Sequence, residues 1–119
     1  MKKNKNTGDI LDALFSLVEE RKKTKKKDSY TVSLLNKGIG EIAKKVSEET
    51  AETIIEAIKG KKKLAIQESS DLLYHLIVMW SKLGINPSQI WNELDKRMKK
   101  PEKKVKKWNT MIIISLQKF

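Results

Sequence analysis

Acidic residues occur in two short, regularly spaced groups in the middle of the chain. The first group, with the pattern E-E-x-x-E, consists of Glu48, Glu49 and Glu52, and the second, with the pattern E-x-x-D, consists of Glu68 and Asp71. Residues three or four apart lie on the same face of a helix, so each group would line up its carboxylates along one side. Carboxylates without histidine or cysteine partners suit a hard cation that prefers oxygen ligands, such as Mg²⁺.

The spacing of apolar residues places the two acidic groups on neighbouring helices. Helical periodicity extends over about 40–59 and again over about 62–83, with Gly60 as a natural stop between them. So short a connection makes the two helices antiparallel neighbours. Glu52 and Glu68 are sixteen residues apart around this turn, so about eight residues run down one helix and about eight return. The two acidic groups should therefore face each other at the same height.

Each acidic group also has an ordinary interpretation. The glutamates of the first helix share one side with Lys45, and apolar residues occupy the other, as on a helix that faces water. These glutamates are five like charges that repel one another at this spacing, which argues for a functional reason; they are Glu41, Glu48, Glu49, Glu52 and Glu56. In the second group, Ser69 or Ser70 could cap a helix that begins late, with Asp71 at its positive end. Residues 72–80 are apolar on every side, however, and a carboxylate buried beside them needs a partner.

The remaining pattern predicts an all-α fold that is like a four-helix bundle. Besides the two central helices, we expect an amphipathic helix at 9–23, a short turn at 31–35 capped by Ser29, and a helix at 87–98 that begins with a proline. No alternation typical of a strand occurs before the tail of the chain.

The apolar stretch at 72–80 also predicts oligomerisation. A domain of this size has little core to spare, and a thin bundle cannot cover a helix that is apolar all round. We therefore expect Leu73, Leu76, Ile77 and Trp80 to be buried, some of them against a second subunit.

Composition and charge argue against several classes of protein. The 119 residues suffice for one domain, expected at 1–98, with a basic tail at 99–119. The net charge of +11 is concentrated in 1–27 and 96–119, around a slightly acidic centre, whereas a nucleic-acid domain carries its charge on the folded binding face. The chain has no cysteine, no secretory signal and no apolar run long enough for a bilayer. We expect a cytoplasmic protein that binds neither membranes nor nucleic acid.

The chain offers few other groups for chemistry. It has no Gly-rich phosphate loop of the Walker type, so any phosphate would be bound by a metal ion and by lysines. The single histidine, His75, shares a face with Glu68 and Asp71. A structural histidine with satisfied hydrogen bonds is the first interpretation, and a role in the site is the second.

Four stretches of the sequence together resemble a known family. They are ILDALFSLVEERK at 10–22, SYTVSLLNKG at 29–38, KKVSEETAETIIEA at 44–57 and ESSDLLYHLIVMW at 68–80. In this order they are similar to the all-α nucleoside triphosphate pyrophosphohydrolases, a superfamily that includes the MazG proteins and the dimeric dUTPases. Within it, the chain resembles most closely the phosphoribosyl-ATP pyrophosphohydrolases of histidine biosynthesis, over about residues 9–98. It departs from them at Ser47, where relatives typically have glycine, and in its basic tail.

The resemblance implies a reaction and a set of site residues. The reaction is hydrolysis of the α–β phosphoanhydride of phosphoribosyl-ATP to phosphoribosyl-AMP and pyrophosphate, with Mg²⁺ as cofactor and a homodimer or larger homo-oligomer as the assembly. The residues expected to hold Mg²⁺ are Glu48, Glu49, Glu52, Glu68 and Asp71, of which the last four are also the expected catalytic residues; Lys37 and Lys45 are the candidates for phosphate contact.

Two alternatives stay open at this point. A house-cleaning NTP pyrophosphatase of the MazG kind would use the same metal chemistry, and only the SYT…KG and DLLYH stretches favour the histidine pathway. The other alternative is a non-enzymatic basic helical module that binds nucleic acid or a protein partner. The acidic centre argues against that module, as does the lack of aromatic residues among the basic runs except Trp108.

Overall fold

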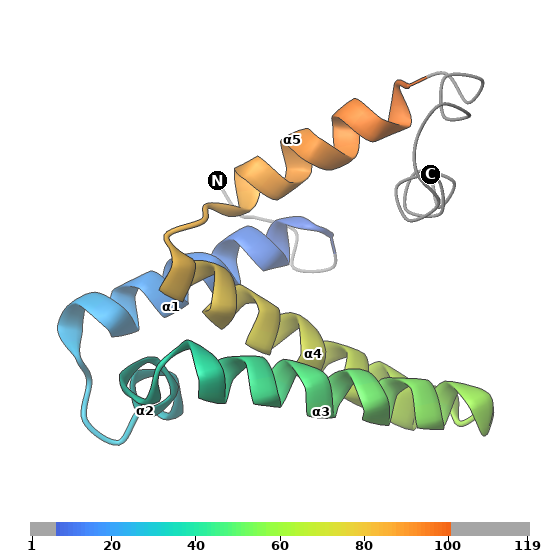
Figure 1. Cartoon of the computed structure of the whole chain (residues 1–119), viewed down its shortest axis with the longest axis horizontal. Helices are drawn as coiled ribbons and strands as arrows, with labels where there is room; N and C mark the ends of the chain where they lie inside the picture. Colours follow the sequence, from blue (N-terminus) through green and yellow to red (C-terminus); the bar gives the residue numbers. More distant parts are fainter. Residues whose placement is uncertain (1–6, 101–119) are drawn as a thin grey trace. The chain divides into compact units, whose positions relative to one another are not determined.

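Five α-helices make up the part of the chain that the structure describes. The structure, a computed structural model, describes residues 7–100, in which no strand occurs (Figure 1). The helices are α1 (Asp9–Thr24), α2 (Tyr30–Lys37), α3 (Ile39–Ile58), α4 (Lys62–Leu83) and α5 (Pro87–Met98). The all-α fold is confirmed, and the four predicted helices begin and end within one residue of their expected bounds.

The helices α3 and α4 form a long antiparallel hairpin. They run side by side in Figure 1 and make the most extensive helix pairing of the fold. Gly60 adopts the left-handed conformation with φ of 70°, which an L side chain rarely adopts. The N–H of Lys61 then donates to the carbonyl of Glu56 at 3.0 Å, which closes the end of α3. This tight turn reverses the chain and sets the register between the two acidic groups.

The helix α2 is longer than the sequence suggested. Only a short turn was predicted at 31–35, but the structure has a helix of eight residues. Its N-cap is Ser29, as predicted, with the side-chain oxygen accepting from the N–H of Val32 at 3.2 Å. Leu34 and Leu35 are buried, so packing against the other helices stabilises a segment too short to be helical alone.

The core lies where α1, α2 and the beginning of α3 meet the second half of α4. Its fully buried apolar side chains are Val18, Leu34, Leu35, Ile42, Ile77 and Val78. The first half of α4 and the second half of α3 extend beyond this core, as the hairpin in Figure 1 shows. Within one chain, Ile77 is therefore buried as predicted, Leu76 and Trp80 are partly buried, and Leu73 is 41% exposed.

The chain divides into two compact units after Pro87, so α5 belongs with the second unit. Pro87 is the first residue of α5, a position where its missing N–H costs no helical hydrogen bond. The predicted division into 1–98 and 99–119 stays a prediction, because all but the first two residues of the tail lie outside the described range. Among residues 7–100, no helix has the length and apolar character that crossing a bilayer requires.

We expect the cap of α2 to contribute measurably to stability. Replacing Ser29 by alanine should lower the free energy of unfolding by about 1 kcal/mol, because the N–H of Val32 loses its acceptor. Urea denaturation would measure the change. Ser33→Ala, in an exposed position of the same helix, is the control and should be nearly neutral. Equal stabilities of the two variants would contradict the capping role.

Candidate active site

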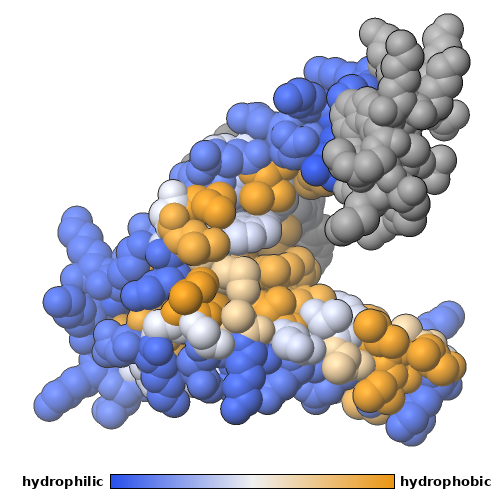
Figure 2. Space-filling view, in the orientation of Figure 1, coloured by the Kyte–Doolittle hydropathy of each residue, from blue (hydrophilic) through white to orange (hydrophobic). Residues whose placement is uncertain are grey.

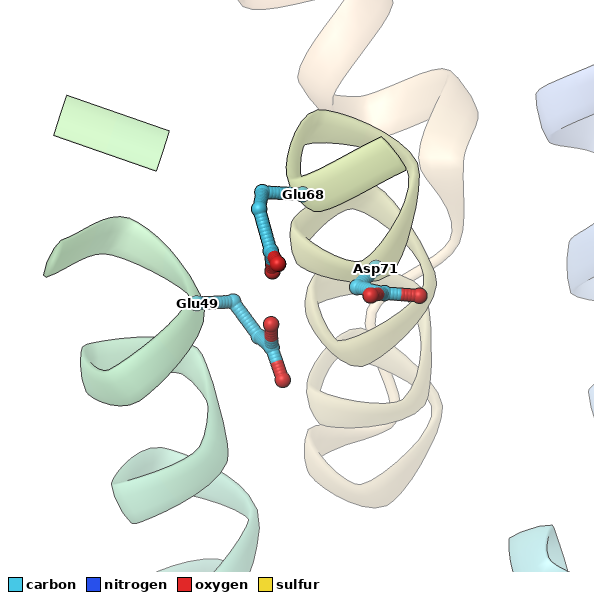
Figure 3. A group of neighbouring side chains, drawn as sticks. All are labelled: Glu49, Glu68 and Asp71. Atoms are coloured by element: carbon cyan, nitrogen blue, oxygen red, sulfur yellow. The ribbon is translucent and has the colours of Figure 1, made fainter. Parts of the chain in front are cut away.

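Three acidic side chains converge between α3 and α4. One carboxylate oxygen each from Glu49, Glu68 and Asp71 lies within 4.8 Å of the other two. In Figure 3, Glu49 from α3 and Glu68 from α4 point toward each other across the hairpin, with Asp71 beside them on α4. We call these three residues the carboxylate cluster. The sequence predicted that the two acidic groups would face each other, and the hairpin brings them together at that level.

The local electrostatics show how crowded the carboxylate cluster is. The pKa of Glu49 is raised from an ordinary 4.5 to about 7. Burial is the largest cause, followed by a hydrogen bond with Glu68. The negative charges of Glu52, Asp71 and Glu68 raise it further. In the metal-free protein, a proton held by Glu49 thus relieves the repulsion near neutral pH.

The other expected ligands lie around this cluster. Glu52 is exposed, one turn along α3 from Glu49, and its charge acts on Glu49. Glu48 is also exposed and is paired with Lys45, whose ammonium nitrogen lies 3.5 Å from its carboxylate oxygen. Whether these two residues bind a metal stays a prediction.

The two candidate phosphate-binding lysines lie in different surroundings. The pKa of Lys45 is raised, mainly by the charge of Glu48 and next by Tyr30, so Lys45 remains a cation. Lys37 lies exposed in the last turn of α2. Its role in phosphate binding rests on the sequence resemblance alone.

His75 is buried, at 5% exposure, and has partners for both ring nitrogens. Its Nδ1 lies 2.8 Å from the carbonyl oxygen of Asp71, and its Nε2 lies 3.1 Å from the hydroxyl of Tyr30. The same Nδ1 is 4.0 Å from a carboxylate oxygen of Glu49. The histidine is therefore satisfied structurally, as first interpreted, and also touches the edge of the carboxylate cluster.

Sequence reasoning missed the hydrogen-bonded residues around this histidine. Tyr30 and Thr31 at the start of α2 pair with His75 and Tyr74 of α4, through Tyr30–His75 and Thr31–Tyr74 hydrogen bonds. The stretches SYT and DLLYH contain all four residues, but their spacing of more than forty residues gives no indication of contact. The pair Tyr74–His75 within the otherwise apolar stretch 72–80 was the available signal. The segment 30–37 contains further polar residues and singled out neither Tyr30 nor Thr31.

The carboxylate cluster fits a small divalent cation. Its donors are all carboxylate oxygens, the ligands that Mg²⁺ and Ca²⁺ prefer. Two oxygens bound to one Mg²⁺ are at most about 4.2 Å apart, so the cluster would close onto the ion with shifts of about 1 Å or less. A cation would also take over the role of the proton on Glu49, because it neutralises the same repulsion.

The raised pKa of Glu49 predicts how metal-free stability depends on pH. Between about 4.5 and about 7, the folded protein retains a proton that the unfolded chain has released, so the Glu49 contribution to the free energy of unfolding falls as pH rises. In Glu49→Gln this contribution should be absent. The free energy of unfolding of the variant should therefore rise relative to that of wild type as pH increases across that range. Urea denaturation in a chelator would measure it. For Glu20→Gln, at an exposed position of α1, the plot of unfolding free energy against pH should be parallel to that of wild type. A Glu49→Gln plot that is also parallel to wild type would refute the prediction.

Comparison with known proteins identifies the family. The model of the phosphoribosyl-ATP pyrophosphohydrolase family matches residues 11–98. A phosphoribosyl-ATP pyrophosphatase of Azospirillum brasilense is 42% identical over 97 residues, which cover 82% of this chain and 87% of the relative. A phosphoribosyl-ATP pyrophosphatase of Granulibacter bethesdensis is 41% identical over 77% of this chain and 58% of the relative. Another, of Sulfolobus acidocaldarius, is 40% identical over 76% of this chain and 96% of the relative. The carboxylate cluster lies within the matched segment, and the chain belongs to the phosphoribosyl-ATP pyrophosphohydrolase family of enzymes.

Proposed function

We propose that the protein hydrolyses the α–β phosphoanhydride of phosphoribosyl-ATP, releasing phosphoribosyl-AMP and pyrophosphate, in the cytoplasm and with Mg²⁺. The observation that carries the proposal is the convergence of Glu49, Glu68 and Asp71, inside the segment that matches the family. A polyphosphate bridged to carboxylates by a cation is a common arrangement for phosphoanhydride cleavage.

Each side chain has a distinct part in this proposal. Glu49, Glu68 and Asp71 would hold the cation, which would supply neutralisation of charge on the polyphosphate and a lower pKa for a bound water. Glu52 is exposed next to them and is placed to orient that water and to accept its proton. The oxygen of the water forms a bond to phosphorus as the bridging P–O bond breaks, and pyrophosphate leaves. Lys45, a cation beside the carboxylates, binds a phosphate of the substrate, with Lys37 as a second candidate.

Removing a carboxylate should abolish the reaction and leave the fold intact. We expect Asp71→Ala and Glu52→Ala to lose Mg²⁺-dependent release of pyrophosphate, and the metal-free variants to be as stable as wild type or more so, because repulsion is removed. The measurement is pyrophosphate release across a Mg²⁺ titration, with phosphoribosyl-ATP compared against a panel of NTPs and dNTPs. Glu20→Ala is the matched control on α1. Wild-type activity of Asp71→Ala at every Mg²⁺ concentration would reject the metal centre.

We also propose that the protein works as a homodimer or larger homo-oligomer. Apolar side chains gather at the free end of the α3–α4 hairpin, where Figure 2 shows a hydrophobic area. The exposed residues are Ile54, Ile55, Ile58, Leu64 and Ile66, with exposures from 38% to 81%. Leu73, which is 41% exposed, lies farther along α4, past Asp71. In addition, one carboxylate oxygen of Glu56 is buried without a hydrogen-bond partner among the described residues. Both features support a second copy that covers this end and supplies a donor.

Charges placed in this hydrophobic area should weaken the assembly. Ile58 and Ile66 are 81% and 66% exposed, so Ile58→Lys and Ile66→Lys should leave a single chain folded and shift sedimentation equilibrium toward monomer. Ile10→Lys, at a position that is 48% exposed on α1, should not change it. A wild-type protein that sediments as a stable monomer at micromolar concentration would contradict the assembly.

A further inference from the structure

Two neighbouring hydrogen bonds join the beginning of α2 to the middle of α4. Tyr30 bonds to His75, and Thr31 bonds to Tyr74. The two links are alike in kind, since each joins a side chain of α2 to a side chain of α4. They differ in the further contacts of the α4 residue. Tyr74 bonds to Thr31, contacts the rings of Tyr30 and His75 and packs against the apolar core, whereas His75 lies next to the carboxylate cluster.

The partners of His75 fix which ring nitrogen carries hydrogen. The carbonyl oxygen of Asp71 can only accept, so the Nδ1 that lies 2.8 Å from it must donate. In the neutral ring, Nε2 is then an acceptor, and the hydroxyl of Tyr30 donates to it at 3.1 Å. The carbonyl of Asp71 thus sets the tautomer, and Tyr30, bonded to the opposite side of the ring, helps to hold its plane. The backbone of Tyr30 directly follows the capping residue Ser29 at the start of α2, and its side chain, 52% exposed, stacks on the ring of Tyr74.

The orientation of this ring bears on Glu49. The Nδ1 of His75, which donates to the carbonyl of Asp71, is also 4.0 Å from a carboxylate oxygen of Glu49. This distance is too long for a hydrogen bond, but it places the positive end of the N–H dipole beside the carboxylate. Glu49 is also the carboxylate that joins α3 to the α4 pair, Glu68 and Asp71. A ring that turned away would remove this dipole from beside Glu49 and break the hydrogen bond to the carbonyl of Asp71. Groups that orient a ligand in this way often alter metal affinity 10- to 100-fold when removed.

We propose that Tyr30 and His75 are positioning residues for the carboxylate cluster: the hydroxyl of Tyr30 fixes the His75 ring, whose Nδ1–H group bonds the backbone of Asp71 and lies beside Glu49, so that both residues are placed for cation binding. The inference rests on the proposed metal centre and adds a function for the SYT and DLLYH stretches. It assigns α2, which contributes no acidic residue, to the site. The opposing explanation is that both hydrogen bonds only attach α2 to α4, in which case Tyr30 and Tyr74 are equivalent.

The first experiment compares Tyr30→Phe with Tyr74→Phe. Each variant removes one hydroxyl and one α2–α4 hydrogen bond and retains the aromatic ring. Binding of Mn²⁺ alone, without substrate, is followed by electron paramagnetic resonance of the free ion, and melting temperatures are recorded in a chelator. We expect both variants to melt earlier than wild type, but only Tyr30→Phe to bind Mn²⁺ about 10-fold more weakly. Equal Mn²⁺ affinities of the two variants would overturn the proposal.

The second experiment substitutes His75. In His75→Asn, the amide N–H occupies about the place of Nδ1–H and should largely rescue Mn²⁺ binding, whereas His75→Leu should weaken it by up to about 100-fold. In the activity assay, Tyr30→Phe and His75→Leu should need more Mg²⁺ for half-maximal turnover, with an unchanged KM at saturating Mg²⁺. If Asn and Leu weaken Mn²⁺ binding equally, His75 does not act through its donor. If His75→Leu fails to fold, the Tyr30→Phe comparison still decides.

The outcomes separate this inference from the proposed function. A wild-type protein that binds no Mn²⁺ would overturn the metal centre and the positioning role together. The wild-type protein could instead bind Mn²⁺, with binding weakened in Tyr30→Phe and His75→Leu as expected, and yet not hydrolyse phosphoribosyl-ATP. That result would retain the positioning role and reject only the substrate. Hydrolysis with Tyr30→Phe indistinguishable from Tyr74→Phe would leave the enzyme established and reject the positioning role.

Discussion

Mutual repulsion of carboxylates held at close range is the constraint on which the rest of this structure depends. Glu49, Glu68 and Asp71 approach one another only because a tight turn at Gly60 returns α4 along α3. Such a cluster is unfavourable unless a proton or a cation lies between its members. The raised pKa of Glu49 indicates that a proton can reduce this repulsion, and the proposed Mg²⁺ would reduce it in the same way. A site that repels itself when empty is well suited to bind a cation together with a polyphosphate.

The rest of the fold serves to hold this hairpin. The core formed by α1, α2 and the two hairpin helices is confined to one end, where Ile42 and Ile77 are fully buried. The carboxylate cluster begins where this core ends, so its backbone is anchored on one side while its side chains remain accessible. The hydrogen bonds from Tyr30 and Thr31 extend the anchored region to His75. A buried, fully bonded histidine beside the carboxylates can therefore serve both stability and function.

The opposite end of the hairpin has a different requirement. Its isoleucines are exposed in a single chain, although they recur with the spacing of a buried helix face. Lysines flank the turn at 59 and 61–63, so this end is charged as well as apolar. The exposed apolar residues suit burial against another surface, and so does the oxygen of Glu56, which has no hydrogen-bond partner within residues 7–100. The proposed second copy would relieve both unfavourable features with one interface, which explains how a domain this small reaches a sufficient core.

The sequence by itself determined the helices, the antiparallel pairing of α3 and α4, and the meeting of their acidic groups, because these follow from periodicity, a glycine stop and a fixed rise per residue. Tertiary structure decided the remainder. It extended α2 from a turn to a helix through burial of Leu34 and Leu35. It also separated the three converging carboxylates from Glu48, which turns to Lys45. Finally, it brought Tyr30 to His75 across 45 residues, since such contacts arise from packing between helices and leave no local pattern in the chain.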